Sequence, residues 1–326
     1  MSARGTLAVA ASAAAALAGR YVAGRSTADR QTVRELDTRL ANLGEVERLT
    51  ILPVVERHTS GPGLRGEPGV SYLVTADDLT MLFDAGLGTG RDRTALESNA
   101  DALGVSLEDL DCVVISHLHA DHVGGARSQL RRTFAFGREH QVPRSLTAFV
   151  PTRMSHPHAD TCVVDQARVI AAGVALLPPL PRMLFWLGPI AEQALVVNVR
   201  GRGLVLISGC GHPQIERTLA AAEMVTDAPV HAVVGGLHLP VHPVGTPLLP
   251  QAVLGNPNWP WRPLGESDAH SVIQSIQERG PGLIALSGHD STPWTQQAFG
   301  RAFGDRYRTV RVGEEIVVTA AIPRSA

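Results

Sequence analysis

The residues with the clearest capacity for chemistry lie together in one short motif. His117, His119, Asp121 and His122 are four potential metal ligands within six residues, directly after an apolar run at residues 111–116 that is predicted to be a strand. Side chains alternate along an extended chain, so His117 and His119 point the same way and can hold one ion together. Asp121 and His122 lie where the chain turns and can face a second ion. Imidazole and carboxylate donors suit zinc, manganese or iron, and so dense a group indicates a metal site rather than a solvent-exposed histidine-rich loop.

Three later histidines occur in a similar context. His212, His238 and His289 each follow a short apolar run that contains glycine. A single histidine in such a place is more often a loop residue than a ligand, but three of them beside a four-ligand motif favour a shared site. We predict that His212 and His289 bind metal and that His238 contacts the substrate or transfers a proton. Six other histidines are not predicted to bind metal: His140, His156, His158, His231, His242 and His270.

Two further residues have roles that the sequence leaves open. Asp84 ends a strand and precedes Ala85-Gly86, where a carboxylate either fixes the tautomer of a ligand histidine or caps a turn. Cys210 is either a small buried hydrophobic residue or a thiolate at the metals. The chain has three widely separated cysteines, which argues against a disulfide framework and leaves the redox compartment undetermined.

The hydrophobic pattern around these residues predicts strands and helices in a definite order. Helices are expected at residues 92–103, 214–225 and 267–279, and from Pro293 onward. The predicted order begins with strands, continues with strands that alternate with helices, and ends with strands. This order fits two packed sheets with helices outside, in the α+β class. The expected strands are residues 48–56, 69–75, 78–83, 111–116, 145–150, 167–177, 194–200, 203–208, 230–234, 282–287, 308–312 and 315–319.

Two apolar, proline-rich stretches interrupt this pattern, at residues 177–189 and 239–264. The second contains Trp259 and Trp261. Both are longer than ordinary connections, and they either cover the edges of the core or line a binding site. Aromatic residues form only 4% of the chain, so their concentration in these stretches favours the wall of a pocket for a small, partly apolar molecule.

The first 45 residues are predicted to be an apolar leader with a linker helix, and residues 46–326 to be the main domain. Residues 6–19 are almost all apolar, between Arg4 and Arg20, and are too few for a typical spanning helix. They resemble a signal-peptide core or an alanine-rich helical extension. An amphipathic helix is expected at residues 31–43. A signal or anchor would place the protein in the cell envelope or outside the cell and allow membrane association through the N-terminus; otherwise it is expected in the cytoplasm.

The overall composition is that of a soluble globular protein. Apolar residues make up 44% of the chain and charged residues 18%, with a net charge of −2. No basic stripe is present, so nucleic acid is not an expected partner. The sequence does not determine the oligomeric state.

Several segments resemble a known family. Residues 103–125 (LGVSLEDLDCVVISHLHADHVGG) resemble the signature of the metallo-β-lactamase superfamily, His-x-His-x-Asp-His, and residues 82–86 (LFDAG) resemble its strand-end Asp motif. Three later motifs are similar to the branch of dihydropterin-using ribofuranosylaminobenzene phosphate synthase-like proteins: SGCGH at 208–212, GGLHL at 235–239 and SGHD at 287–290. The resemblance covers about residues 48–320.

The resemblance implies an αββα sandwich that holds two divalent metal ions, zinc in the first place and manganese or iron as alternatives. By residue matching, one ion is held by His117, His119 and His212, and the other by Asp121, His122 and His289. Many superfamily members have an Asp that bridges the two ions at the end of a later strand. This chain has Gly209-Cys210-Gly211-His212 there instead.

The activity that the resemblance implies is metal-dependent hydrolysis of an ester, phosphoester, lactone or amide by a metal-bound hydroxide. Asp121 would orient the hydroxide or accept its proton, and His238 would hold the substrate or donate to the leaving group. Two alternatives remain. A non-catalytic, envelope-associated metal-binding module would bind metal without turnover. A di-iron redox protein usually has a Glu among its ligands, and His119 stands where it would fall.

Overall fold

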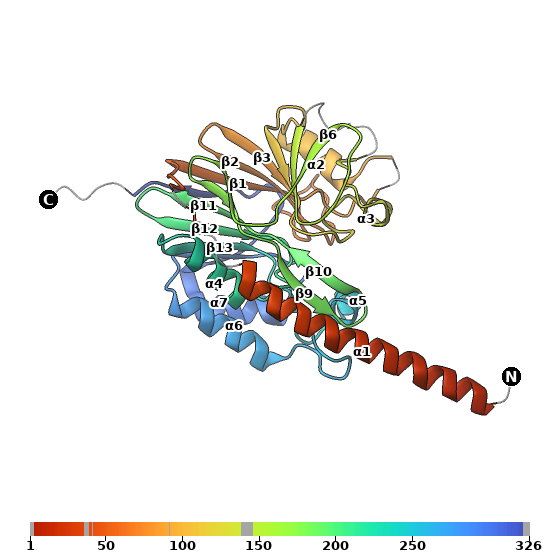
Figure 1. Cartoon of the computed structure of the whole chain (residues 1–326). Coiled ribbons are helices and arrows are strands. Elements are labelled where there is room, and N and C mark those ends of the chain that lie inside the picture. Colours follow the sequence, from red (N-terminus) through yellow and green to blue (C-terminus); the bar gives the residue numbers. More distant parts are fainter. Residues whose placement is uncertain (1–2, 36–38, 41, 91, 138–145, 322–326) are drawn as a thin grey trace.

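The computed structural model describes residues 3–35, 39–40, 42–90, 92–137 and 146–321, and most of its strands form two seven-stranded mixed sheets (Figure 1). The first sheet has the order β16 (Ile316–Thr319), β1 (Arg48–Val55), β2 (Ser71–Ala76), β3 (Leu79–Phe83), β4 (Cys112–Val114), β5 (Leu146–Val150) and β6 (Ala159–Val163). The second has the order β15 (Tyr307–Thr309), β14 (Leu283–Leu286), β13 (Val230–Gly235), β12 (Gly203–Ser208), β11 (Leu195–Val199), β8 (Val174–Leu176) and β7 (Arg168–Ala171). Strands β9 (Leu180–Leu184) and β10 (Gly188–Glu192) form a separate hairpin.

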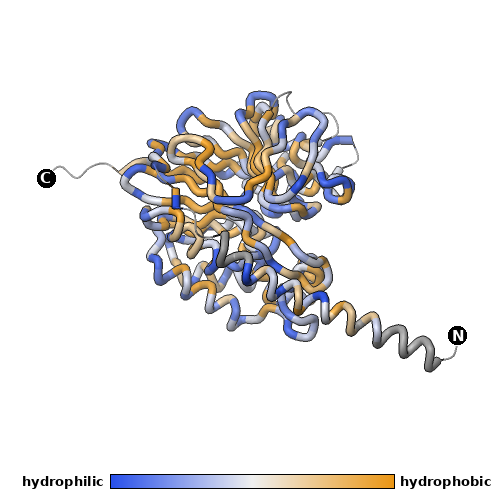
Figure 2. The backbone as a smooth tube through the Cα atoms, viewed as in Figure 1, coloured by the Kyte–Doolittle hydropathy of each residue, from blue (hydrophilic) through white to orange (hydrophobic). Residues whose placement is uncertain are grey.

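The two sheets face each other, and helices cover their outer faces. Ile51 and Val74 of the first sheet share a buried cluster with Val197, Ile207 and Val234 of the second, and Figure 2 shows this interior as the hydrophobic part of the chain. The helices are α1 (Ala3–Glu35), α2 (Ala95–Leu103), α3 (Ala126–Arg131), α4 (Ile215–Val225), α5 (Leu249–Leu254), α6 (Glu266–Glu278) and α7 (Pro293–Phe303), with a 3₁₀ turn at Gly304–Arg306.

The outer layers complete an αββα sandwich. Leu96 of α2 is buried in a cluster with residues of the first sheet. Leu219 of α4, Ile276 of α6 and Phe299 of α7 are buried in a cluster with residues of the second sheet. The predicted α+β class and αββα architecture are therefore confirmed.

Local sequence signals explain where α2 begins and ends. The Thr94 hydroxyl accepts the Glu97 N–H, and the Glu97 carboxylate accepts the Thr94 N–H in return, which forms a capping box. The helix ends at Gly104, whose φ of 67° is left-handed and favours glycine. The helix therefore begins a few residues after the predicted start at residue 92, while its predicted end is correct.

The N-terminal helix differs from the prediction. A single helix, α1, runs over Ala3–Glu35, so the expected linker helix at residues 31–43 is wrong: residues 31–35 continue α1 and residues 39–40 and 42–43 are not helical. Alanine has the highest helix propensity, and neither Gly19 nor Gly24 ends the helix. The division of the chain near residue 45 stays a prediction, although α1 packs against β9 and β10.

The stretch at residues 177–189 was expected to be a loop, and this is also wrong. It forms β9 and the turn into β10, with Gly188 at a left-handed φ of 88°. Its prolines concealed the strand signal, but proline is tolerated where strands have open edges, as in this two-stranded hairpin. The predicted strand at 167–177 is interrupted at Gly173 and forms β7 and β8. The stretch at 239–264 contains the short helix α5.

We expect Gly124→Ala to lower the free energy of unfolding by roughly 2–4 kcal/mol. Gly124 follows the histidine motif with a left-handed φ of 79°, and a Cβ there would lie 2.1 Å from the Ala135 carbonyl oxygen. Urea denaturation of the variant would measure the loss. Gly61→Ala is the matched control, because an added Cβ there meets nothing within 4 Å; equal effects of the two substitutions would contradict this explanation.

Candidate metal centre

The candidate ligands lie at the carboxyl ends of strands from both sheets. His117–His122 follow β4, Cys210 and His212 follow β12, and His289 follows β14. Strands β12, β13 and β14 are parallel neighbours, so the residues that follow them emerge at one edge of the sheet, as in other parallel sheets. The sandwich brings this edge against the end of β4.

Three imidazoles form the first group. The Nε2 atom of His117 and the Nε2 atom of His212 each lie 3.1 Å from Nδ1 of His119, and one nitrogen from each ring lies within 4.8 Å of the others. Burial lowers the pKa of all three histidines, that of His119 to about 4. The rings are therefore neutral near pH 7, the form in which imidazole binds a metal.

A carboxylate, two imidazoles and a thiol form the second group. The Sγ atom of Cys210 lies 3.1 Å from Nε2 of His122 and 3.2 Å from Nε2 of His289. Asp121 Oδ2 lies 3.7 Å from the same His122 nitrogen. Ligand atoms of these four residues lie within 4.8 Å of one another. Convergent donors of this kind fit zinc or a similar divalent cation.

The structure brings all six predicted ligands together, in the two groups that the resemblance implies. Cys210, whose role the sequence left open, lies in the second group and is also within ligand distance of His212 and His238. It therefore occupies the boundary between the groups, where many relatives are expected to have an Asp. Metal binding by these residues stays a prediction. His140 lies outside the described residues, and His156, His158, His231, His242 and His270 are in none of the potential metal-binding groups found among them.

The Asp84 carboxylate contacts one candidate ligand directly and a second one through Ser116. This buried carboxylate lies 2.6 Å from Nδ1 of His122, accepts the Ser116 N–H at 2.7 Å and accepts the Ser116 hydroxyl at 2.6 Å. That hydroxyl is also 2.9 Å from Nδ1 of His117. The carboxylate therefore leaves the Nε2 atoms of two candidate ligands facing the metal groups, which supports the orienting role over the turn-capping one.

We expect Asp84→Asn to weaken metal binding by about 10–100-fold, the usual effect of losing a carboxylate behind ligand histidines. The amide is isosteric but has a single oxygen, so it cannot accept the Ser116 N–H at one position and the Ser116 hydroxyl and His122 at the other, as the carboxylate does. Competition with a chromophoric chelator would measure the affinity. The exposed neighbour Asp78 supplies the control Asp78→Asn, and an unchanged affinity in Asp84→Asn would contradict the orienting role.

Three further buried carboxylates support the ligand loops and were not predicted. Glu56, at the end of β1, accepts the Ser287 hydroxyl, which lies 2.5 Å from Nδ1 of His289. Burial raises the pKa of Glu56 to about 7.

Glu192 accepts the backbone N–H groups of residues 210–212 at 2.8–2.9 Å. Asp290 accepts the His238 N–H at 2.8 Å. A charged residue that directly follows or ends an apolar strand is the only sequence signal for Glu56 and Glu192.

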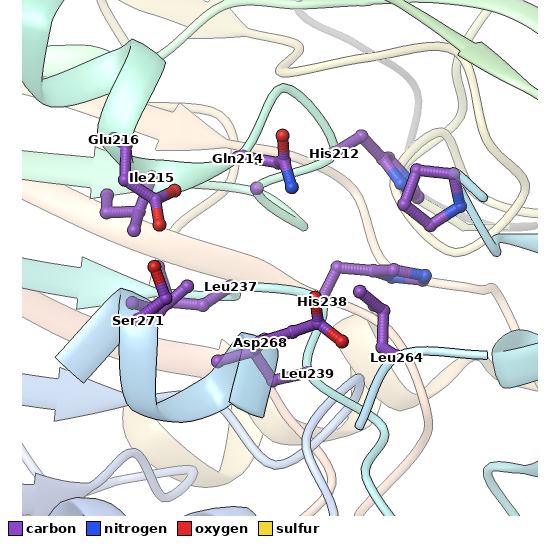
Figure 3. A pocket seen from close by; sticks show the side chains of 13 residues that line it. His212, Gln214, Ile215, Glu216, Leu237, His238, Leu239, Leu264, Asp268 and Ser271 are labelled. Atoms are coloured by element: carbon purple, nitrogen blue, oxygen red, sulfur yellow. The ribbon is translucent and has the colours of Figure 1, made fainter. Parts of the chain in front are cut away.

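His238 lies beside the first group rather than in it. Its ring centroid is 4.6 Å from that of His212, and its φ of 48° is left-handed. The two rings lie side by side at one end of a small cavity of about 80 Å³, with Glu216 and Ser271 toward the other end (Figure 3). Neither ring nitrogen of His238 has a hydrogen-bond partner among the described residues. Burial lowers its pKa to about 4, which favours holding a group over donating a proton; its role stays a prediction.

A larger groove opens beside the first group. It has a volume of about 1050 Å³ and is lined by Leu118 and His119, by Arg132 and Arg153, and by β10 with its preceding turn. The residues of the β9–β10 hairpin that line it are Pro181, Leu187, Pro189, Ile190 and Ala191. The predicted role of the stretch at 177–189 as a pocket wall thus agrees with the structure, although the stretch is a hairpin and not a loop.

A family model matches the part of the chain that contains the histidine motif. Residues 64–142 match the model of the metallo-beta-lactamase superfamily, and this range contains the strand-end Asp84 and the histidine motif. The match covers about a quarter of the 326 residues, and it agrees with the αββα sandwich that the structure has.

Two solved structures share the fold over most of the chain. One is Tm1679, described as a metal-dependent hydrolase of the beta-lactamase superfamily, with a TM-score of 0.59, 20% identity, and coverage of 83% of this chain and 99% of that one. The other is the metallo-beta-lactamase fold protein YhfI from Bacillus subtilis, with a TM-score of 0.51, 14% identity, and coverage of 83% and 100%. At these identities the likeness concerns the fold alone.

The sequence relatives match over shorter stretches. The anti-Pycsar protein Apyc1 of Paenibacillus sp. (strain J14) is 40% identical over 68 residues, which are 21% of this chain and 25% of that protein. The probable metallo-hydrolase YqjP of Bacillus subtilis (strain 168) is 44% identical over 55 residues, 17% of each chain. The matched part thus spans a quarter or less of the length of these relatives.

Proposed function

We propose that this chain is a metal-dependent hydrolase that binds two divalent cations, zinc first among them, in the two ligand groups. The observation that carries the proposal is the convergence of five imidazoles, a carboxylate and a thiol beside an open groove. When bound, such cations supply Lewis acidity and an activated water at neutral pH. The resemblance to the dihydropterin-using branch is not part of this proposal.

Residues in and beside the groove can position the attacking water and the substrate. The Asp121 side chain is 18% exposed, so its carboxylate can orient the attacking water and accept its proton. His119 lies at the groove wall, where the reacting bond of the substrate must come. Arg132 and Arg153 can bind a phosphate or carboxylate group, and the proline-rich hairpin offers an apolar surface. We therefore propose an ester, phosphoester, lactone or amide substrate with both an apolar and an anionic part.

A substrate screen on a defined metal form tests this proposal. The purified protein would be loaded separately with zinc, manganese and iron, and assayed on chromogenic esters, lactones, amides and phosphodiesters, with and without an anionic group. Turnover that requires metal, and that is lost together with part of the bound metal in Asp121→Asn, is the expected result. Metal binding without turnover on any class would favour the non-catalytic module. Oxygen consumption by the iron form alone would favour the redox protein.

A further inference from the structure

An aromatic cluster fixes α1 to the body of the protein. The Tyr21 ring lies 4.9 Å from Trp259 and 5.3 Å from Phe185, centroid to centroid. The Tyr21 hydroxyl donates to the Pro257 carbonyl at 2.6 Å. The cluster joins the middle of α1 to the turn of the β9–β10 hairpin and to the segment after α5, three parts of the chain that are far apart in sequence.

Large apolar side chains are exposed around this cluster. Trp261 is 75% exposed and stacks on Trp259, and Trp186 is 45% exposed and lies against Phe185. Three of the four tryptophans of the chain therefore lie at this place. Apolar side chains that are exposed on the adjoining segments are Val22, Leu187, Leu249, Val253 and Leu254. We call this surface, with its three tryptophans, the aromatic face. Grouped exposed apolar side chains of this kind mark an interaction site rather than ordinary surface.

The charges of the contributing segments are all of one sign. Residues 1–28, 177–191 and 239–265 contain no Asp or Glu, although the whole chain has 31 acidic and 29 basic residues. The same segments contain arginines, namely Arg4, Arg20, Arg25, Arg182 and Arg262. Arg182 is buried, but Arg20, Arg25 and Arg262 are exposed and favour a negatively charged partner. A symmetric pair of copies would place these arginines against one another, because a two-fold interface presents the same patch from both sides.

Helix α1 continues beyond the body from this face (Figure 1). Residues 6–19 are alanine-rich and apolar, and Ala13, Ala15 and Ala16 are exposed. Within the described part of the chain, no helix has the length and hydropathy needed to cross a bilayer. Tryptophan is enriched at the interface of a membrane, and arginines flank the apolar part of α1.

We propose that the aromatic face docks on the surface of an anionic lipid bilayer. Trp186, Trp261 and the projecting part of α1 would enter the headgroup region, and Arg20, Arg25 and Arg262 would contact lipid phosphates. Binding does not require metal or catalysis, so this proposal is independent of the hydrolase activity.

Liposome co-sedimentation of the full chain tests the proposal. Wild-type protein would be mixed with vesicles of phosphatidylcholine alone and with vesicles containing phosphatidylglycerol. We expect binding that rises with the anionic fraction, falls with salt and shifts the tryptophan emission to shorter wavelength. The double variant Trp186→Ser/Trp261→Ser should bind at least about tenfold more weakly, and Arg20→Gln/Arg262→Gln should lose the preference for anionic vesicles.

Two exposed residues away from the face supply matched controls, Met224→Ser for the apolar change and Arg127→Gln for the charge. Both should bind as wild type does. The proposal is overturned by absent binding of wild-type protein, by equal binding to neutral and anionic vesicles, or by full binding of the tryptophan variant. A lipid-free dimer, detected by light scattering and lost in the tryptophan variant, would assign the face to self-association instead and would also overturn it.

Discussion

Replacing His117 with alanine is expected to lower the bound metal from about two equivalents to one or fewer and to reduce hydrolysis by at least ~1,000-fold. His117 is fully buried, and its Nε2 atom is 3.1 Å from the ligand nitrogen of His119. Alanine removes a donor that no neighbouring side chain can replace. Elemental analysis of the purified variant, with activity measured on the substrate class found in the screen, would determine both effects.

The matched control is His270→Ala, which removes an exposed histidine that is in neither ligand group. It should leave metal content and activity unchanged. Circular dichroism of His117→Ala would exclude a general loss of the fold as the cause. If His117→Ala kept its full metal content, the three-imidazole group would not be a metal site.

Replacing Cys210 with alanine is expected to remove about one metal equivalent and to leave the other in place. The Cys210 thiol lies within 3.2 Å of two histidine nitrogens of the second group, whereas the first group has three imidazoles of its own. Burial raises the pKa of this thiol well above its usual value. A bound cation is therefore required to stabilise the thiolate, and binding should release its proton.

Cobalt substitution separates a ligand role from a packing role for Cys210. A thiolate-to-cobalt charge-transfer band should be present in the wild-type protein and absent in Cys210→Ala and Cys210→Asp. The aspartate variant should recover part of the metal content, because a carboxylate can bridge two ions. Cys162→Ser, at the edge strand β6, is the control and should retain the band. A wild-type protein without the band would leave Cys210 as a buried hydrophobic residue.

The parts of the fold that the sequence predicted are those with strong local signals. The strands at residues 48–56 and 78–83 and the helix at 267–279 were evident because their apolar residues repeat with the period of the element. The histidine motif was evident because its spacing places several donors on one turn. The order of strands and helices was compatible with two packed sheets with helices outside, and the resemblance to a family specified the αββα sandwich.

The parts that were missed depend on contacts between distant residues. The strand β9 was hidden by its prolines and forms only because β10 pairs with it. The packing of α1 on the body could not be predicted from alanine content, since the aromatic contacts of Tyr21 involve Phe185 and Trp259, which are far away in the sequence. The position of Cys210 between His122 and His289 likewise depends on the packing of the two sheets, which no local pattern indicates.

The buried carboxylates behind the ligands also bear on how metal binding depends on pH. Asp84, Glu56, Glu192 and Asp290 are all nearly or fully inaccessible to solvent, and leaving charges unpaired in a protein interior costs several kcal/mol for each one. Burial raises the pKa of each of these four carboxyls, so each favours a bound proton unless a cation is near. Two divalent cations would favour the charged forms. Loss of a cation should therefore be accompanied by proton uptake at these carboxyls, and the metal should be bound less tightly as the pH falls.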